Sequence, residues 1–156
     1  MNEELAKRLR ELLLDGKWIA NTNFQDEIRS TSWQEAIYKH GKLNSIALLT
    51  FHINYYLNGL CNVFEGGGLE IRDKYSFEMP AIGSQSDWDD LIYEFLGNAE
   101  RFSKHVSNMD EQQLQQPFVK EEFGTYQRNI EAQIEHGYYH LGQVVILKKL
   151  LEQMEN

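Results

Sequence analysis

Residues that break helices are scarce in this chain. Its 156 residues include only two prolines, Pro80 and Pro117, and eleven glycines, so long stretches carry no breaker. Such a chain favours helices over short strands joined by tight turns. Hydrophobic residues make up 42% and charged residues 25%, the balance of a soluble globular protein. Eight Phe, eight Tyr and three Trp supply bulk for a core, and the length fits one domain, 1–156.

Four segments have apolar residues at helical spacing. They run from Asn2 to Asn21, including Trp18 and Ile19 in the apolar stripe, from Asn44 or Ser45 to the glycines 66–68, from Ser86 through Val106, and from Thr125 to about Gln153. Short capped turns are expected at 32–35 and 110–113, and a long loop at 69–85, extended around 74–77, separates the second and third helices. Helices of about 20 residues are each about 30 Å long. The sequence therefore predicts an all-α four-helix bundle.

The charge balance excludes several classes of partner. Fifteen basic residues against 24 acidic ones give a net charge of −9 and leave no basic cluster, so we expect no binding to nucleic acid or to an anionic membrane. No apolar run approaches the roughly 20 residues of a membrane span. The acidic N-terminus does not resemble a secretory signal, which makes a cytoplasmic protein the simplest expectation.

The single cysteine, Cys61, excludes an internal disulfide framework and a cysteine-based zinc module. It follows His52 by nine residues, which is half a turn out of phase on a helix. A Cys–His nucleophile using His52 is therefore not expected, and Cys61 is interpreted as a small buried apolar residue.

Three of the five histidines are candidates for a metal site. His136 and His140 form an i, i+4 pair that lies on one face of the last helix, beside its apolar stripe. His52 lies in the middle of the apolar stripe of the second helix. Three imidazoles are the ligand number of an open, catalytic type of zinc site, and three hydrogen-bonded packing histidines without a metal are the alternative. The pattern lacks the Glu of a His-Glu-x-x-His protease, because Gly137 follows His136, and it contains no Glu-x-x-His pair of a di-iron bundle.

The segment from Ser45 to His52, together with His136-x-x-x-His140-x-Gly142-Gln143, resembles the DinB/YfiT-like metalloenzyme family. The order of the predicted helices is also similar, so the resemblance covers nearly the whole chain. It implies that His52, His136 and His140 bind one divalent metal ion, with solvent in the remaining positions. One departure is Leu141, which stands where the family often has Arg.

Members of that family with assigned activities include transferases that depend on low-molecular-weight thiols. The resemblance thus implies a metal-dependent enzyme, a thiol-dependent transferase acting on a small electrophilic substrate. Zinc or nickel is the expected ion, since neutral imidazoles suit both. The alternative is a non-catalytic metal-binding or helical interaction module.

Candidates for substrate binding are Tyr56, one turn beyond His52, Tyr139, next to His140, and Trp18, after the first helix. Core packing, capping or a turn is an alternative role for each. A homodimer is also expected, because the third and fourth helices carry aromatic residues on more than one face. Those residues are Trp88, Tyr93, Phe95, Tyr138 and Tyr139.

Overall fold

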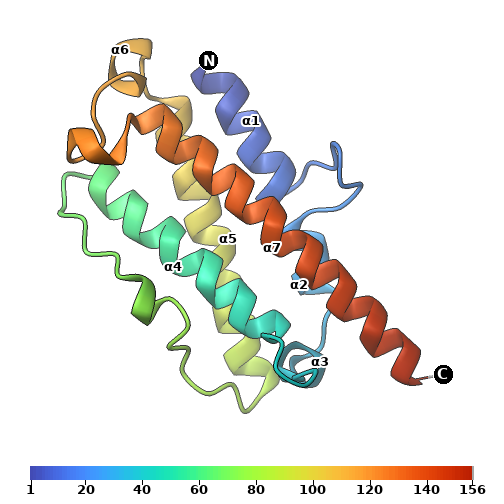
Figure 1. Ribbon diagram of the computed structural model, residues 1–156. Coiled ribbons are helices and arrows are strands. Elements are labelled where there is room, and N and C mark those ends of the chain that lie inside the picture. Colours follow the sequence, from blue (N-terminus) through green and yellow to red (C-terminus); the bar gives the residue numbers. More distant parts are fainter. Residues whose placement is uncertain (156) are drawn as a thin grey trace.

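The computed structural model describes residues 1–155, and in that range the protein is all-helical, as the sequence predicts. Its four longest helices pack side by side (Figure 1): α1 (Asn2–Leu13), α4 (Ile46–Phe64), α5 (Gln85–Ser107) and α7 (Tyr126–Glu155). Helices α1 and α4 each contact both α5 and α7, so the four close around one apolar core. None of the helices in residues 1–155 is both long and apolar enough to cross a membrane.

Shorter elements occupy the connections between the long helices. These are α2 (Phe24–Arg29), α3 (Trp33–Ile37), α6 (Glu111–Leu114) and two 3-10 turns, η1 (Asp73–Tyr75) and η2 (Glu121–Phe123). No β-strand forms within the described residues, where residues 117 and 125 pair in an isolated bridge. Helix α2 is not predicted by the sequence pattern, because its six residues are too few to show helical periodicity.

Side-chain caps set the beginnings of several helices. The capping box at Ser32 and Glu35 is confirmed, as is the cap of α6, where the Asp110 side chain accepts a hydrogen bond from the backbone of Gln113. The predicted start of the third helix at Ser86 is wrong. Helix α5 begins two residues earlier with Ser84 as its cap, because the Asp87 carboxylate also accepts a hydrogen bond from the backbone of Gly83 and supports the earlier start.

The first helix ends well before the predicted Asn21. It stops at Leu13, and the chain turns back at Gly16, where an added Cβ would lie 2.4 Å from the Cα of Glu11. The turn is held by Asn23, whose side-chain amide donates a hydrogen bond to the Gly16 carbonyl at 2.7 Å. Trp18 and Ile19 therefore leave the apolar stripe and are 71% and 83% exposed.

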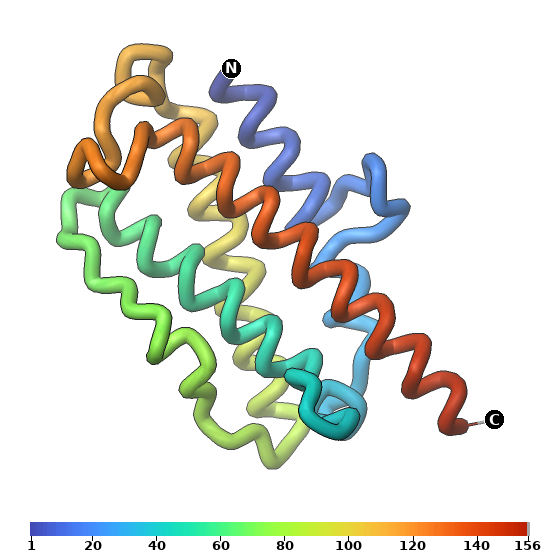
Figure 2. Tube along the Cα trace, viewed as in Figure 1, coloured from blue at the N-terminus to red at the C-terminus, as the bar shows by residue number. Residues whose placement is uncertain are grey.

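The long loop after α4 runs back along that helix as a strap, defined here as residues 69–82 (Figure 2). Its contacts follow an antiparallel register against α4. Ile71 packs directly on Gly59, where an added Cβ would lie 2.3 Å from the Ile71 side chain, and the Tyr55 hydroxyl bonds to the backbone of Arg72. The predicted extended conformation around residues 74–77 is wrong, because the chain forms the 3-10 turn η1 at this point.

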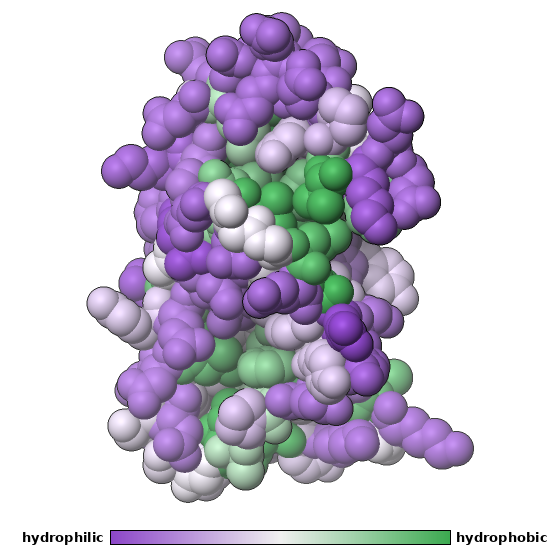
Figure 3. Space-filling view, turned by 90° about the vertical axis from the view of Figure 1, so that its left-hand side faces the viewer, coloured by the Kyte–Doolittle hydropathy of each residue, from purple (hydrophilic) through white to green (hydrophobic). Residues whose placement is uncertain are grey.

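The aromatic residues that suggested a homodimer separate into two groups. Trp88 and Phe95 are completely buried between the helices, whereas Tyr93 and Tyr139 are exposed. Tyr138 is partly buried, so the helices leave some of these rings exposed, as expected. Hydrophobic surface also gathers in patches on the side of the molecule that faces left in Figure 1 (Figure 3). The homodimer stays a prediction.

Helix α7 approaches α1 closely at a glycine. An added Cβ at Gly137 would lie 2.3 Å from a methyl carbon of Leu12, whereas one at Gly142, on the same helix, would meet no atom within 4 Å. The absence of a side chain at residue 137 therefore permits the close packing of α7 on α1.

We expect Gly137→Ala to lower the free energy of unfolding by about 1–3 kcal/mol, because the methyl group overpacks the contact with Leu12. The matched variant Gly142→Ala should raise it by about 0.5–1 kcal/mol, since alanine favours a helix over glycine. Denaturant unfolding of both variants provides the measurement. Equal effects of the two substitutions would contradict this account of the packing.

Candidate metal centre

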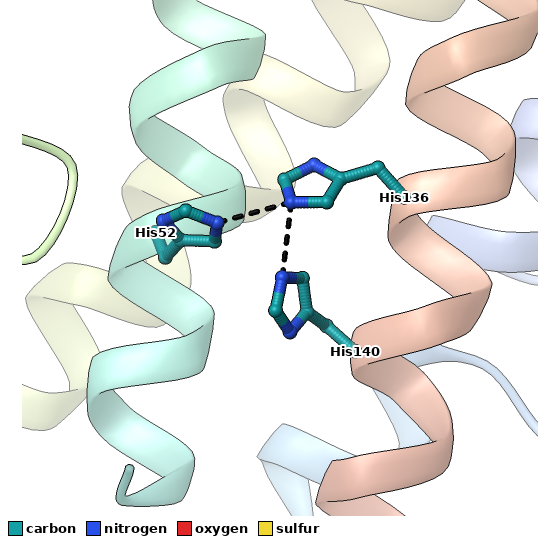
Figure 4. Close-up of side chains that lie close together, drawn as sticks. All are labelled: His52, His136 and His140. Carbon is teal, nitrogen blue, oxygen red and sulfur yellow. Dashed lines mark hydrogen bonds between the residues drawn. The ribbon is translucent and has the colours of Figure 1, made fainter. Parts of the chain in front are cut away.

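Three histidine side chains converge in the seam between α4 and α7 (Figure 4). The Nε2 atom of His136 lies 3.0 Å from Nε2 of His52 and 2.9 Å from Nε2 of His140. His52 comes from the middle of α4, and the other two lie one turn apart on α7. The rings of His52 and His140 are almost completely buried. The structure thus brings together the three histidines that the sequence singles out, in an arrangement that could hold a metal ion.

Hydrogen bonding alone does not account for this arrangement. A ring nitrogen of a neutral imidazole carries either one proton or one lone pair, so it cannot donate and accept at once. If Nε2 of His136 is protonated, it can donate to one neighbour only; if it is not, its single lone pair faces two neighbours. A cation that receives one lone pair from each of the three Nε2 atoms resolves this conflict.

The distances between the nitrogens also fit one shared ion. Zinc binds histidine nitrogen at about 2.0–2.1 Å, and two nitrogens at that radius are about 3 Å apart when the angle between them is near 90°. The separations of 3.0 and 2.9 Å agree with this value. Two of the three separations thus suit one shared ion, and the ligand atoms of all three histidines lie within 4.8 Å of one another.

Burial keeps the cluster neutral, which is the form that binds metals. Burial, together with the proximity of His140, lowers the pKa of His52 to about 4. Burial and the two neighbouring histidines likewise lower the pKa of His136 to about 4, and burial lowers the pKa of His140. All three lone pairs are consequently available at neutral pH.

Gln143 fixes the orientation of His140. Its side-chain oxygen lies 2.6 Å from Nδ1 of His140, so Nδ1 carries the proton and donates it to the amide oxygen. This bond leaves the lone pair on Nε2, which faces the other two histidines. Partners of this kind orient metal-binding histidines and raise their basicity. The i, i+3 spacing of the two residues on one helix is the signal from which this contact could have been predicted.

The strap and one tyrosine cover the cluster. The ring of Phe77 stacks on the ring of His52, with centroids 4.1 Å apart and planes inclined by 6°. Tyr56 presents its ring edge-on to His52 at 5.1 Å and to His136 at 5.4 Å. Its hydroxyl donates a hydrogen bond to the carboxylate of Asp73 in η1. Sequence reasoning missed Phe77 and Asp73, because nothing in the order of the residues reveals that the loop folds back over α4.

The structure places the three candidate substrate-binding residues in different surroundings. Tyr56 adjoins the cluster, and burial, together with the bond to Asp73, raises the pKa of its hydroxyl to about 12. Tyr139 contacts the ring of His140 edge-on at 4.9 Å but is 65% exposed. Trp18 lines another pocket with Tyr138 and charged residues of α1, and none of the three histidines lines that pocket.

The other residues with potential chemistry lie elsewhere. His105 and His40, the two histidines outside the cluster, are both partly buried. His105 contacts the carboxylate of Glu65 at 2.8 Å. Cys61 is fully buried, which raises the pKa of its thiol, in agreement with its interpretation as an apolar core residue. Leu141 is buried in the apolar core.

Comparison with protein-family models, with curated proteins and with solved structures finds no match for this chain in any of the three. The fold and the site therefore define the protein by themselves. It is an all-helical protein with a cluster of three histidines, His52, His136 and His140, that could hold a metal ion.

We expect His136→Ala to lose most of the bound metal, because His136 supplies the nitrogen that lies closest to both others. Gln143→Ala should weaken binding by about tenfold to a hundredfold, the usual effect of removing a partner of a metal-binding histidine. Metal content after dialysis against a defined ion, measured by elemental analysis, tests both. His105→Ala is the control and should keep the metal content of the wild type; equal loss in the control and in His136→Ala would refute the cluster as the binding site.

The metal-free protein should lose stability in acid. Histidines of the unfolded chain keep a pKa of about 6.5, whereas the pKa of folded His52 and of folded His136 is about 4, so the unfolded state takes up protons first. The contribution to stability is complete above about pH 6.5 and declines as the pH falls toward about 4. Denaturant unfolding of chelator-treated protein across this range measures the decline. In His136→Gln the free energy of unfolding should fall less steeply with pH, because one of these histidines is gone. The same pH dependence in the variant and the wild type would contradict this prediction.

Proposed function

We propose that this protein is a metalloenzyme of the DinB/YfiT-like type, a four-helix bundle that holds one divalent ion between α4 and α7. His52, His136 and His140 are the proposed ligands, and zinc or nickel is the proposed ion. The observation that carries the proposal is the approach of His136 Nε2 to two other ring nitrogens at 3.0 and 2.9 Å, which hydrogen bonds among the rings leave unsatisfied.

A catalytic role is favoured over a structural one. Structural zinc sites normally use four protein ligands, and a set of three leaves at least one position open. The helices also enclose a continuous apolar core that does not include the histidines, so the fold has little need of an ion. These two features are typical of a site that binds a small ligand.

The reaction that we propose is the transfer of a low-molecular-weight thiol to a small electrophilic substrate. A divalent ion at this position supplies Lewis acidity, which lowers the pKa of a thiol or water bound to it. The carbon–sulfur bond forms as the bond from carbon to the leaving group breaks, and the thiol proton passes to solvent.

The residues around the cluster have distinct roles in this proposal. Gln143 holds His140 in the tautomer that leaves Nε2 free. Phe77 and Tyr56 exclude water from one side of the imidazoles, which strengthens electrostatic interactions there. Tyr139, in contact with His140 and largely exposed, lies where a substrate could meet it. Trp18 lines another pocket, which none of the three histidines lines, so a substrate that meets both must extend from one site to the other.

Cobalt substitution followed by thiol titration tests the function. A thiolate that binds cobalt should add a sulfur-to-metal charge-transfer band in the near ultraviolet. We expect this band with at least one simple thiol in the wild type, and we expect it to be lost in His136→Ala. If simple, cysteinyl and glutathione-like thiols all leave the cobalt spectrum unchanged, a non-catalytic metal-binding or helical interaction module becomes the better account.

A further inference from the structure

One carboxylate stands beside the histidine cluster. Asp73 opens η1 in the strap, and its side chain accepts a hydrogen bond from the hydroxyl of Tyr56, whose ring contacts both His52 and His136. The hydroxyl of Ser76 bonds to the Asp73 carbonyl at 2.7 Å and holds the turn in place. Two independent hydrogen bonds thus position this negative charge near the site.

The carboxylate of Asp73 is close enough to the cluster to act on its imidazoles. Apart from the histidines themselves, Asp73 is the charged group that acts on His52 and His136. The basic residues on either side of Asp73, Arg72 and Lys74, are exposed, and the Lys74 ammonium lies over the ring of Tyr75. Among the described residues, Asp73 therefore supplies the fixed charge that acts most directly on the cluster.

This charge limits the ligands that suit the site. A divalent ion carries two positive charges; a bound thiolate offsets one of them, and the carboxylate of Asp73 weakens the attraction that the other exerts on a second anion. Asp73 repels an anionic group elsewhere on the thiol, and added salt screens this repulsion. A cationic or neutral group meets no such repulsion.

We propose that Asp73 is a specificity-determining residue, and that the site selects thiols whose remaining part is cationic or neutral over thiols that carry a second anionic group. The proposal rests on the proposed function, since it concerns the thiol that the metal centre binds. It names an amine-bearing or uncharged small thiol as the class of ligand.

Three small thiols of similar size test the selection: cysteamine, 2-mercaptoethanol and 3-mercaptopropionate. Each is titrated into the cobalt-loaded protein at one pH and low ionic strength, with the charge-transfer band as the readout. We expect the affinity to fall in that order. The three thiols also differ in their own acidity, so their affinities for one protein are not compared alone. The decisive quantity is the dissociation constant of 3-mercaptopropionate divided by that of cysteamine, measured in the wild type and in Asp73→Asn. That ratio should shrink by about threefold to tenfold.

Asp73→Asn is suited to this test because residue 73 is exposed and the amide oxygen still accepts the bond from Tyr56. Glu70→Gln, which removes an equal charge from the same loop, is the matched control and should keep the ratio of the wild type. Added salt should reduce the ratio in the wild type and have less effect in Asp73→Asn.

The outcomes separate the two proposals. If thiols bind and the ratio is the same in wild type and Asp73→Asn, or changes equally in Glu70→Gln, the selection by Asp73 is wrong while thiol binding stands. If no thiol changes the cobalt spectrum, the proposed function fails, and the selection fails with it.

Discussion

The close contact of Gly137 with Leu12 is the constraint on which the placement of the cluster depends. Helix α7 presents Gly137 to α1 and, from the adjacent residue, His136 to α4. Neighbouring residues of a helix point about 100° apart, so these two contacts together fix both the distance and the rotation of α7. A methyl group at residue 137 would push the helix away from α1 and so disturb the meeting of His136 with His52.

The cluster is also a place where the protein gives up stability. Three imidazoles with lowered pKa values lie in a seam that an all-apolar set of side chains could fill, and His136 Nε2 faces two nitrogens at once. Well-packed apolar side chains would remove both the desolvation and the unsatisfied lone pairs. Side chains that are less stabilising than an apolar alternative at the same position are characteristic of functional sites rather than of packing interfaces.

Helical periodicity predicted the all-helical fold and the approximate span of the long helices, and the i, i+4 pair with His52 predicted the three residues that converge. Helical periodicity failed where a contact outside the helices, or a choice between two similar caps, decides where an element begins, ends or lies. The end of α1 depends on Asn23 reaching back to Gly16, and the competing caps Ser84 and Ser86 follow the same spacing rule. The positions of Phe77 and Asp73 follow from the strap folding over α4, and a pattern along the chain carries no information about such a return.

The ligands of the site and their cover come from separate segments of the chain. The histidines belong to two packed helices, whereas their cover and its charge come from one continuous loop that contacts α4 at Gly59, Tyr55 and His52. Substitutions or length changes in that loop can alter what reaches the imidazoles without touching the helix packing that positions them. Descendants of such a chain could therefore exchange ligands while keeping the same three nitrogens in place, since loops tolerate change far better than packed helices.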